Sequence, residues 1–301
     1  MTDQPNLLTQ FSNALATRAD AAKNAVVAIR LAHGRHMTGM VWGPDIVVAS
    51  EQSLPRNDDF ELVAAGGSAV TASTAGRDPT TNIAILRLAQ PIASPSIAAG
   101  EVHTGAIALA IGADGTGGVS ARLGLVNLAG AEWHSSRGGL IDRRIVLDIG
   151  LARREEGGPV FDAAGACLGM STFGPRGQVI VIPTATIERI VPLLQKDGRI
   201  PRGWLGVALQ PVAVPDALRE SADQSSGLMV MSVVEDGPAA QAGIVAGDII
   251  LSVDGISAHR FRRIAGYFGS GSIGRKVDVR LIRSGKVITV QTTIAERPAN
   301  E

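Results

Sequence analysis

The sequence predicts a mainly β protein of two units, and three observations support this. Hydrophobic residues make up 45% of the 301 residues, whereas aromatic residues make up only 3% and Gly occurs 36 times. Short apolar segments separated by Gly, Pro, Asn or Asp turns fill residues 25–186, and a second series begins at residue 202. Such a pattern favours short strands over long helices. A chain of this length is also long for one compact domain.

Composition excludes several kinds of partner. Lys and Arg together number 28, and so do Asp and Glu, so no net charge draws nucleic acid or an anionic membrane. The single cysteine, Cys167, excludes an internal disulfide, and its apolar surroundings predict a core residue. No apolar run is long enough to span a bilayer. We expect no cofactor, no bound metal and no membrane span.

Residues 1–24 are predicted to form an amphipathic helix, because Leu7, Leu8, Phe11 and Leu15 recur near helical spacing. No basic segment followed by an apolar run precedes them, so the sequence as given shows no signal peptide. We therefore expect a cytoplasmic protein, or a periplasmic one if an exporting segment has been removed. The apolar stripe predicts self-association, with folding back onto the protein's own β unit as the alternative.

Residues 25–186 are predicted to form an all-β unit, a barrel or a sandwich pair. Its strand-like segments include "NAVVAIRLA", "DIVVAS", "NIAILRLA", "AIALAIG", "RRIVLDIG" and "QVIVIPT". Residues 187–201 are predicted to form a linker helix. Its apolar positions and its closing residues are Ile187, Ile190, Val191, Leu194, Gly198 and Pro201.

Residues 202–296 form the second unit, followed by a tail at 297–301. The segment "GPAAQAGIVAGDIILSVDG" predicts a short helix, a turn at Gly247-Asp248, a strand and a hairpin, and the unit resembles a PDZ domain. The resemblance implies that a peptide adds as a strand beside "LGVALQ", with its C-terminal carboxylate held by backbone N–H groups. The loop and the opposite helix would contribute Arg202, Gly203, Trp204, Leu205, Gly206, Val207, Phe261, Ile264 and Phe268. Alternatively, Phe261 and Phe268 fill the core.

Three motifs precede this unit in a fixed order. "DIVVASEQSL" ends a strand in a turn, "DPTTNIAILRL" leads into another strand, and "REEGGPV" carries a Gly-Gly-Pro turn. Together with the PDZ-like unit, they resemble the HtrA/Deg family of serine proteases over residues 20–296. The resemblance implies a chymotrypsin-like double β-barrel followed by a PDZ-like domain. It also implies a homotrimer joined by the N-termini.

The resemblance places other residues where the family has its catalytic His, Asp and Ser. Gln52 stands at the histidine, Asn82 at the aspartate and Glu156 at the serine, while Arg154 and Glu155 replace the Gly-Asn that precedes the nucleophile. A carboxamide cannot take a proton near neutral pH, and a neutral Asn82 cannot stabilise an imidazolium. A carboxylate at Glu156 is a poor nucleophile and would repel an oxyanion. Every role of the triad is therefore removed.

Three functions remain open. We expect a non-catalytic adaptor or scaffold that binds protein or peptide ligands, including free C-termini. The alternatives are an enzyme with unconventional or metal-assisted hydrolysis, and a structural subunit that assembles with an active relative. His33 and His36 form an H-x-x-H pair, but no third ligand follows at a diagnostic spacing, so solvated loop histidines are the simpler interpretation.

Overall fold

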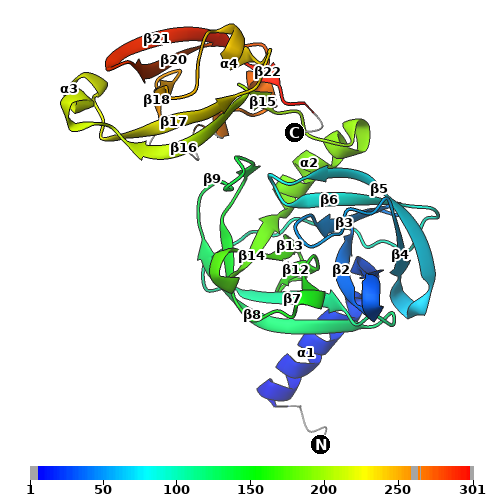
Figure 1. The fold of residues 1–301 in the computed structure, drawn as a ribbon. Helices are drawn as coiled ribbons and strands as arrows, with labels where there is room; N and C mark the ends of the chain where they lie inside the picture. The colour runs from blue at the N-terminus through cyan, green and yellow to red at the C-terminus, as the bar shows by residue number, and fades with distance from the viewer. Residues whose placement is uncertain (1–5, 259–263, 265, 299–301) are drawn as a thin grey trace, which may run out of the picture. The chain divides into compact units, whose positions relative to one another are not determined.

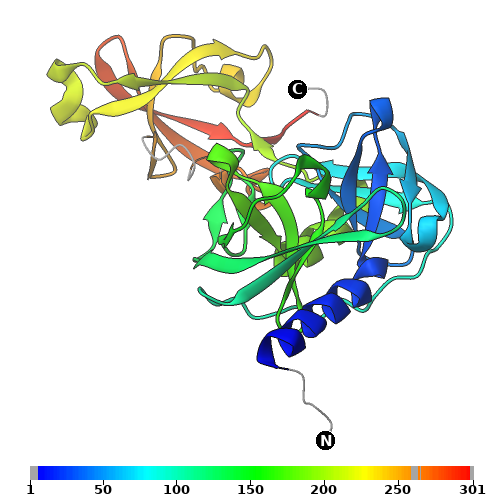
Figure 2. The same cartoon turned by 90° about the horizontal axis from the view of Figure 1, so that it is seen from below.

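The computed structural model describes residues 6–258, 264 and 266–298. These residues form two compact units, which are described separately. Unit 1 comprises residues 1–133 and 141–200, and unit 2 comprises residues 134–140 and 201–301. Figures 1 and 2 show the course of the chain through both.

Unit 1 contains two closed six-stranded antiparallel barrels (Figure 1). Around the first barrel the order is β1 (Val26–Arg30), β2 (His36–Val41), β3 (Ile46–Ser50), β6 (Ile83–Leu88), β5 (Ala69–Asp78) and β4 (Asp59–Val63). Around the second it is β11 (Ile145–Asp148), β14 (Val179–Pro183), β13 (Cys167–Phe173), β12 (Pro159–Asp162), β7 (Ile107–Ala113) and β8 (Val119–Ala129). The short strands β9 (Trp133–His134) and β10 (Leu140–Ile141) pair with each other. The double-barrel prediction is confirmed.

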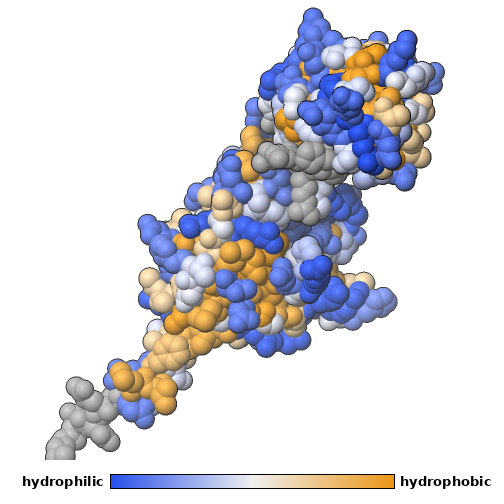
Figure 3. Space-filling view, turned by 90° about the vertical axis from the view of Figure 1, so that its left-hand side faces the viewer, coloured by the Kyte–Doolittle hydropathy of each residue, from blue (hydrophilic) through white to orange (hydrophobic). Residues whose placement is uncertain are grey.

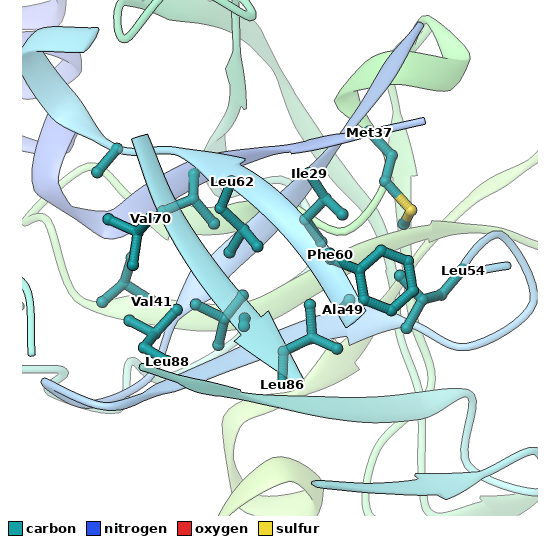
Figure 4. Close-up of a cluster of buried hydrophobic side chains, with 14 of the residues drawn as sticks. Ile29, Met37, Val41, Ala49, Leu54, Phe60, Leu62, Val70, Leu86 and Leu88 are labelled. Atoms are coloured by element: carbon teal, nitrogen blue, oxygen red, sulfur yellow. The ribbon is translucent and has the colours of Figure 1, made fainter. Parts of the chain in front are cut away.

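Alternating apolar residues fill the first barrel. Figure 4 shows Ile29, Phe60, Leu62 and Leu86 gathered in its interior, and each of these side chains is at most 5% exposed. Because successive residues of a strand point to opposite faces, one row from each strand reaches this core. A rigid barrel of this kind can hold the loops at its ends in fixed positions.

Helix α2 (Thr184–Asp197) packs against unit 1 and ends at Gly198, which has a left-handed φ of 69°. Its apolar face, Ile187, Ile190, Val191 and Leu194, is buried in the cluster that contains Ile85 and Met170. The sequence predicts a linker helix over 187–201, whereas the structure starts the helix three residues earlier. This helix belongs to unit 1 because its apolar face is buried in the core there, whereas the apolar face of a free linker would be exposed.

Unit 2 is built around one antiparallel sheet in the order β16 (Val207–Ala213), β17 (Ser226–Val233), β18 (Ile249–Val253), β20 (Lys276–Arg283) and β21 (Lys286–Thr293), with β19 (Ile256–Ser257) beside β18. A separate pair joins β15 (Gly203–Trp204) to β22 (Ala295–Glu296). The short helices are α3 (Arg219–Ala222) and α4 (Pro238–Gln241). Leu228, Val230 and Leu281 contribute to the core.

Helix α1 (Leu7–Ala21) begins at Asn6, whose side chain accepts a hydrogen bond from the Thr9 backbone N–H at 2.9 Å. No residue of α1 is buried, and Leu7 and Leu8 are 82% and 79% exposed. Figure 3 shows apolar residues on this helix and on the adjoining face of unit 1. Of the helices in the described residues, none combines the length and apolar character needed to cross a membrane.

Candidate functional site

The three residues that the sequence predicts at the triad positions meet between the two barrels of unit 1. Gln52 lies just after β3, Asn82 just before β6, and Glu156 just before β12. The Gln52 Nε2 donates to Glu156 Oε1 at 2.6 Å, and the Gln52 backbone N–H donates to Asn82 Oδ1 at 2.8 Å. Residues more than a hundred positions apart therefore share one hydrogen-bonded site.

Local turns hold the two first-barrel residues in place. The Asp78 carboxylate accepts hydrogen bonds from the Thr80 backbone N–H at 3.0 Å and from the Thr81 hydroxyl at 2.6 Å, which fixes the turn before β6. Asn82 follows with a φ of 62°, a left-handed conformation that asparagine tolerates better than most residues. The Arg77 guanidinium donates to the carbonyls of Leu54 and Pro55, so the loop carrying Gln52 is also anchored.

The Glu156 carboxylate is surrounded by donors and is only 1% exposed with the rest of its residue. Besides the Gln52 amide, its Oε1 accepts from the hydroxyls of Ser50 at 2.9 Å and Thr172 at 2.7 Å. Its Oε2 accepts from the Ser53 hydroxyl at 2.5 Å. A buried carboxylate without such donors would be costly, and here neutral hydrogen bonds replace water.

Asn82 bonds to the residues around Glu156 rather than to Glu156 itself. Its Nδ2 donates to the Thr172 hydroxyl at 2.8 Å and to the Ser50 hydroxyl at 3.0 Å, so each hydroxyl accepts from Asn82 and donates its own hydrogen bond to Glu156. We refer to the six residues Ser50, Gln52, Ser53, Asn82, Glu156 and Thr172 as the Glu156 network. Sequence reasoning missed its three hydroxyl residues. Polar residues within or next to apolar strands were the available signal.

Glu155 is anchored separately. Its carboxylate accepts from Arg122 Nε at 3.1 Å, Ser120 Oγ at 3.0 Å and the Ala152 backbone N–H at 2.7 Å. Burial alone would raise the pKa of this carboxyl. The hydrogen bonds and the Arg122 charge outweigh burial, so the pKa of Glu155 lies below its ordinary value. Gly112 leaves room for it, because a Cβ there would lie 2.8 Å from Glu155 Cγ.

In the turn that would form an oxyanion hole, backbone N–H groups donate to carbonyls of the same turn. Residues Arg153–Glu155 form a 3-10 turn, in which the Glu155 N–H donates to the Ala152 carbonyl at 2.9 Å. The Glu156 N–H, which occupies the nucleophile's position, donates to the Arg153 carbonyl at 3.4 Å. The Thr38 hydroxyl holds the Arg154 carbonyl at 2.7 Å from β2. The nucleophile-position amide therefore points into its own turn rather than toward a substrate carbonyl.

The Glu156 network contains no serine–imidazole pair of the kind that serine proteases use. Glu156 is the one ionisable side chain in the Glu156 network, and its hydroxyl and amide neighbours donate to it. No member of the network is an imidazole that could take a proton from Ser50, Ser53 or Thr172. Elsewhere, His36 Nε2 lies 3.1 Å from the Ala113 carbonyl oxygen and His33 is exposed. Across the described residues, no group of three or more His, Cys, Asp or Glu side chains is arranged to hold a metal.

The predicted carboxylate loop of unit 2 is shaped by backbone contacts. The Gly203 N–H donates to the Phe268 carbonyl at 2.9 Å, and the Leu205 and Gly206 carbonyls accept from Ala239 and Val234 at 2.9 and 2.8 Å. Gly206 has a φ of 77°, and a Cβ there would lie 3.1 Å from the Trp204 ring. Glycine is required here for both reasons.

The predicted second wall of the groove is only partly described. Phe261 lies outside the described residues. Ile264 is 4% exposed and packs in the core of unit 2, and its part in peptide binding stays a prediction. Phe268 is half-buried against the same core and meets Tyr267 edge to face at 5.9 Å. Apolar residues at helical spacing serve the core first, which explains both placements.

Two family models match the chain. A trypsin-like peptidase domain matches residues 37–170, and a PDZ domain matches residues 203–294. The chain is 30% identical over 296 residues to a protein of Brucella suis named a probable periplasmic serine endoprotease DegP-like. A protein of Bartonella henselae with the same name is 29% identical over 264 residues. The alignments cover 94% and 85% of this chain but 57% and 52% of those relatives, so the chain spans about half of their length.

Solved structures agree with this result. The serine endoprotease from Yersinia pestis is 25% identical, with a TM-score of 0.71 and coverage of 98% of this chain and 100% of that one. The HtrA-type protease AlgW with decapeptide is 23% identical, with a TM-score of 0.71. The match covers 94% of this chain and 99% of that chain, and it shows that the two share a fold. The family of this chain follows from its two barrels, from the order of the matched domains and from these relatives. The chain belongs to the HtrA family, in which a trypsin-like peptidase domain is joined to a PDZ domain.

Proposed function

We propose that this chain is a non-catalytic member of the HtrA family that binds peptide segments or C-termini through its PDZ domain. One observation carries the first half of the proposal: Glu156 stands at the nucleophile position, is buried, and accepts hydrogen bonds from Gln52, which stands at the histidine position. A serine protease needs a serine hydroxyl at the first of these positions and an imidazole base at the second, and this pair has a carboxylate and an amide instead. The named relatives are endoproteases, so the proposal separates this chain from them.

The test is hydrolysis by the purified full chain. We expect no cleavage of casein and no labelling by a fluorophosphonate probe, which reacts with activated serines. The control is the Glu156→Ala variant prepared in the same way. Casein cleavage by the parent chain that is lost in this variant would overturn the proposal and favour unconventional hydrolysis.

The second half of the proposal concerns peptides. It is supported by the PDZ domain match, by the backbone loop Trp204–Val207, and by a structural neighbour whose name includes a decapeptide. Successive backbone N–H groups can hold a carboxylate, and an edge strand can pair with an extended peptide. A peptide with a free apolar C-terminal residue should bind more tightly than the same peptide with a C-terminal amide. Equal titration curves for the two would exclude carboxylate capture.

We also propose a periplasmic location. The sequence favours the cytoplasm, but the matched relatives are named periplasmic, and the cytoplasmic expectation finds no support among them. Cell fractionation of the native producer, followed by detection with an antibody against this chain, tests the location. Recovery in the cytoplasmic fraction alone would contradict it.

A further inference from the structure

Strand β16 is the edge strand of the unit 2 sheet. In the described part of the chain it pairs with β17 on one side and with no strand on the other. Figure 1 shows β16 at the margin of the sheet. A strand of this kind leaves every second residue with an outward-facing N–H and C=O, which an extended peptide can use.

Hydrogen bonds at the two ends of β16 determine which residues face outward. The Gly206 carbonyl accepts from Val234 N at 2.8 Å, and the Val214 N–H donates to the Ser225 carbonyl at 2.9 Å. Both even-numbered residues therefore face β17. The register shift within this pair leaves the extra residue, Met231, on β17, so the alternation along β16 continues unbroken. The odd-numbered residues face the open edge.

The outward-facing residues are therefore Val207, Leu209, Pro211 and Ala213. Leu209 can offer both an N–H and a carbonyl to a neighbouring strand. Pro211 has no N–H, and the ring δ-carbon occupies the place where that hydrogen would stand. The carbonyl oxygen of a peptide strand beside β16 would therefore face this carbon, and would find no hydrogen-bond donor there. Proline at such a position ends a ladder on its outer side.

We propose that Pro211 limits peptide recognition by this domain to the last three or so residues of a C-terminus. This inference rests on the proposed function, because it assumes that the carboxylate binds at the Trp204–Val207 loop. Peptide residues that face β16 then alternate, with the terminal residue beside Val207 and the residue two before it beside Leu209. The residue four before the terminus would lie beside Pro211, where the ladder ends. The ligand is thus a short, apolar, free C-terminus rather than a long extended segment.

The experiment is a calorimetric titration of the full chain with two acetylated peptides. One is Leu-Ala-Val, which reaches Leu209, and the other carries four additional alanines before the same three residues. We expect the Kd values of the parent chain for the two peptides to agree within about twofold. In the Pro211→Ala variant, a new N–H should strengthen binding of the longer peptide by about fivefold and leave the shorter one unchanged. Pro215→Ala, beyond the end of β16, is the matched control and should behave as the parent chain does.

Two outcomes overturn the inference in different ways. If the parent chain gains as much from the added residues as Pro211→Ala does, Pro211 sets no limit although the peptide function stands. If no variant binds either peptide, and amidated and acid forms are alike, the proposed peptide function fails and the inference falls with it. Thermal unfolding of each variant shows whether the substitution has disturbed the sheet.

Discussion

Replacing Glu156 by alanine should destabilise unit 1 strongly, although the residue performs no chemistry in the proposed function. The substitution removes the acceptor of four side-chain hydrogen bonds, from Ser50, Gln52, Ser53 and Thr172. A hydrogen bond to a charged group contributes about 1.5–3 kcal/mol, so simple addition gives roughly 6–12 kcal/mol. That sum is an upper limit, because bonds within one network are not additive.

Two effects reduce the loss. The hydroxyls of Ser50 and Thr172 lie 3.2 Å apart and can bond to each other, and the Gln52 amide keeps the Phe173 carbonyl as a partner. Removing the carboxylate also removes the cost of keeping a charge out of water. We therefore expect a net loss of about 3 kcal/mol in the free energy of unfolding. For a unit of this size, that corresponds to a decrease in Tm of about 6–12 °C.

Differential scanning calorimetry of the full chain is the appropriate measurement, because two units can unfold in separate transitions. The transition of unit 2 serves as an internal reference. Glu61→Ala is the matched control, since Glu61 forms only an exposed ion pair with Arg30 at 3.1 Å and such pairs contribute about 0–1 kcal/mol. A Tm decrease no larger than that of the control would refute the reasoning, and would mean that desolvation cancels the network's hydrogen bonds.

Three further predictions concern catalysis, pH and assembly. Placing His, Asp and Ser at the three triad positions should leave the chain unlabelled by a fluorophosphonate probe, because the 3-10 turn stays closed. Adding Arg154→Gly and Glu155→Asn to this triple variant should raise labelling. Labelling of the triple variant without these two changes would contradict the prediction. Burial raises the pKa of Asp248, but hydrogen bonds from Arg283 and from the Val245 backbone N–H outweigh it, so the pKa lies below its ordinary value. This carboxylate therefore stabilises unit 2 above the ordinary pKa of an aspartate and loses its contribution as the pH falls through the lowered pKa. The acid-side decrease in the Tm of unit 2 should flatten in Arg283→Met, and an unchanged profile would exclude this pair as its source. Removing residues 1–18 should convert an oligomer, expected to be a trimer, to a monomer in light scattering, whereas a monomeric full chain would exclude association through α1.

The sequence predicted short strands and turns well because these depend on local patterns, whereas the double barrel was implied by the resemblance to the HtrA/Deg family. Alternating apolar residues and Gly-containing turns are visible in short windows. It predicted the role of α2 less well, because the same apolar face can cover a linker or join a core. The burial of Leu194 against Gly76, where an added Cβ would lie 2.9 Å from the leucine Cβ, is a tertiary fact that no helical period shows.

The candidate site was predictable at its three triad positions and not beyond them. The resemblance to the HtrA/Deg family predicts that Gln52, Asn82 and Glu156 share one site, and the structure brings them together. Thr172 shows the limit: it is a threonine in an apolar strand, and only the folded barrels bring its hydroxyl to 2.7 Å from Glu156. The closed turn before Glu156 also depends on Arg122, which lies 33 residues away in sequence from Glu155.

The three residues predicted at the triad positions are linked to one another by hydrogen bonds. A carboxylate can be buried at Glu156 only if its neighbours donate hydrogen bonds. The Gln52 side-chain nitrogen offers two N–H donors, which reach Glu156 and the Phe173 carbonyl, whereas a neutral histidine has only one N–H. Asn82 likewise offers an N–H to Thr172 that an aspartate lacks, which leaves the threonine hydroxyl free to donate to Glu156. Gln52 therefore donates to the Glu156 carboxylate directly, and Asn82 donates to Thr172, which in turn donates to Glu156. Reverting any one of them alone should leave the network with a mismatched donor or acceptor, so single revertants should be less stable than the parent chain and still inactive. A single revertant that gains hydrolysis at unchanged Tm would show that the three positions act independently.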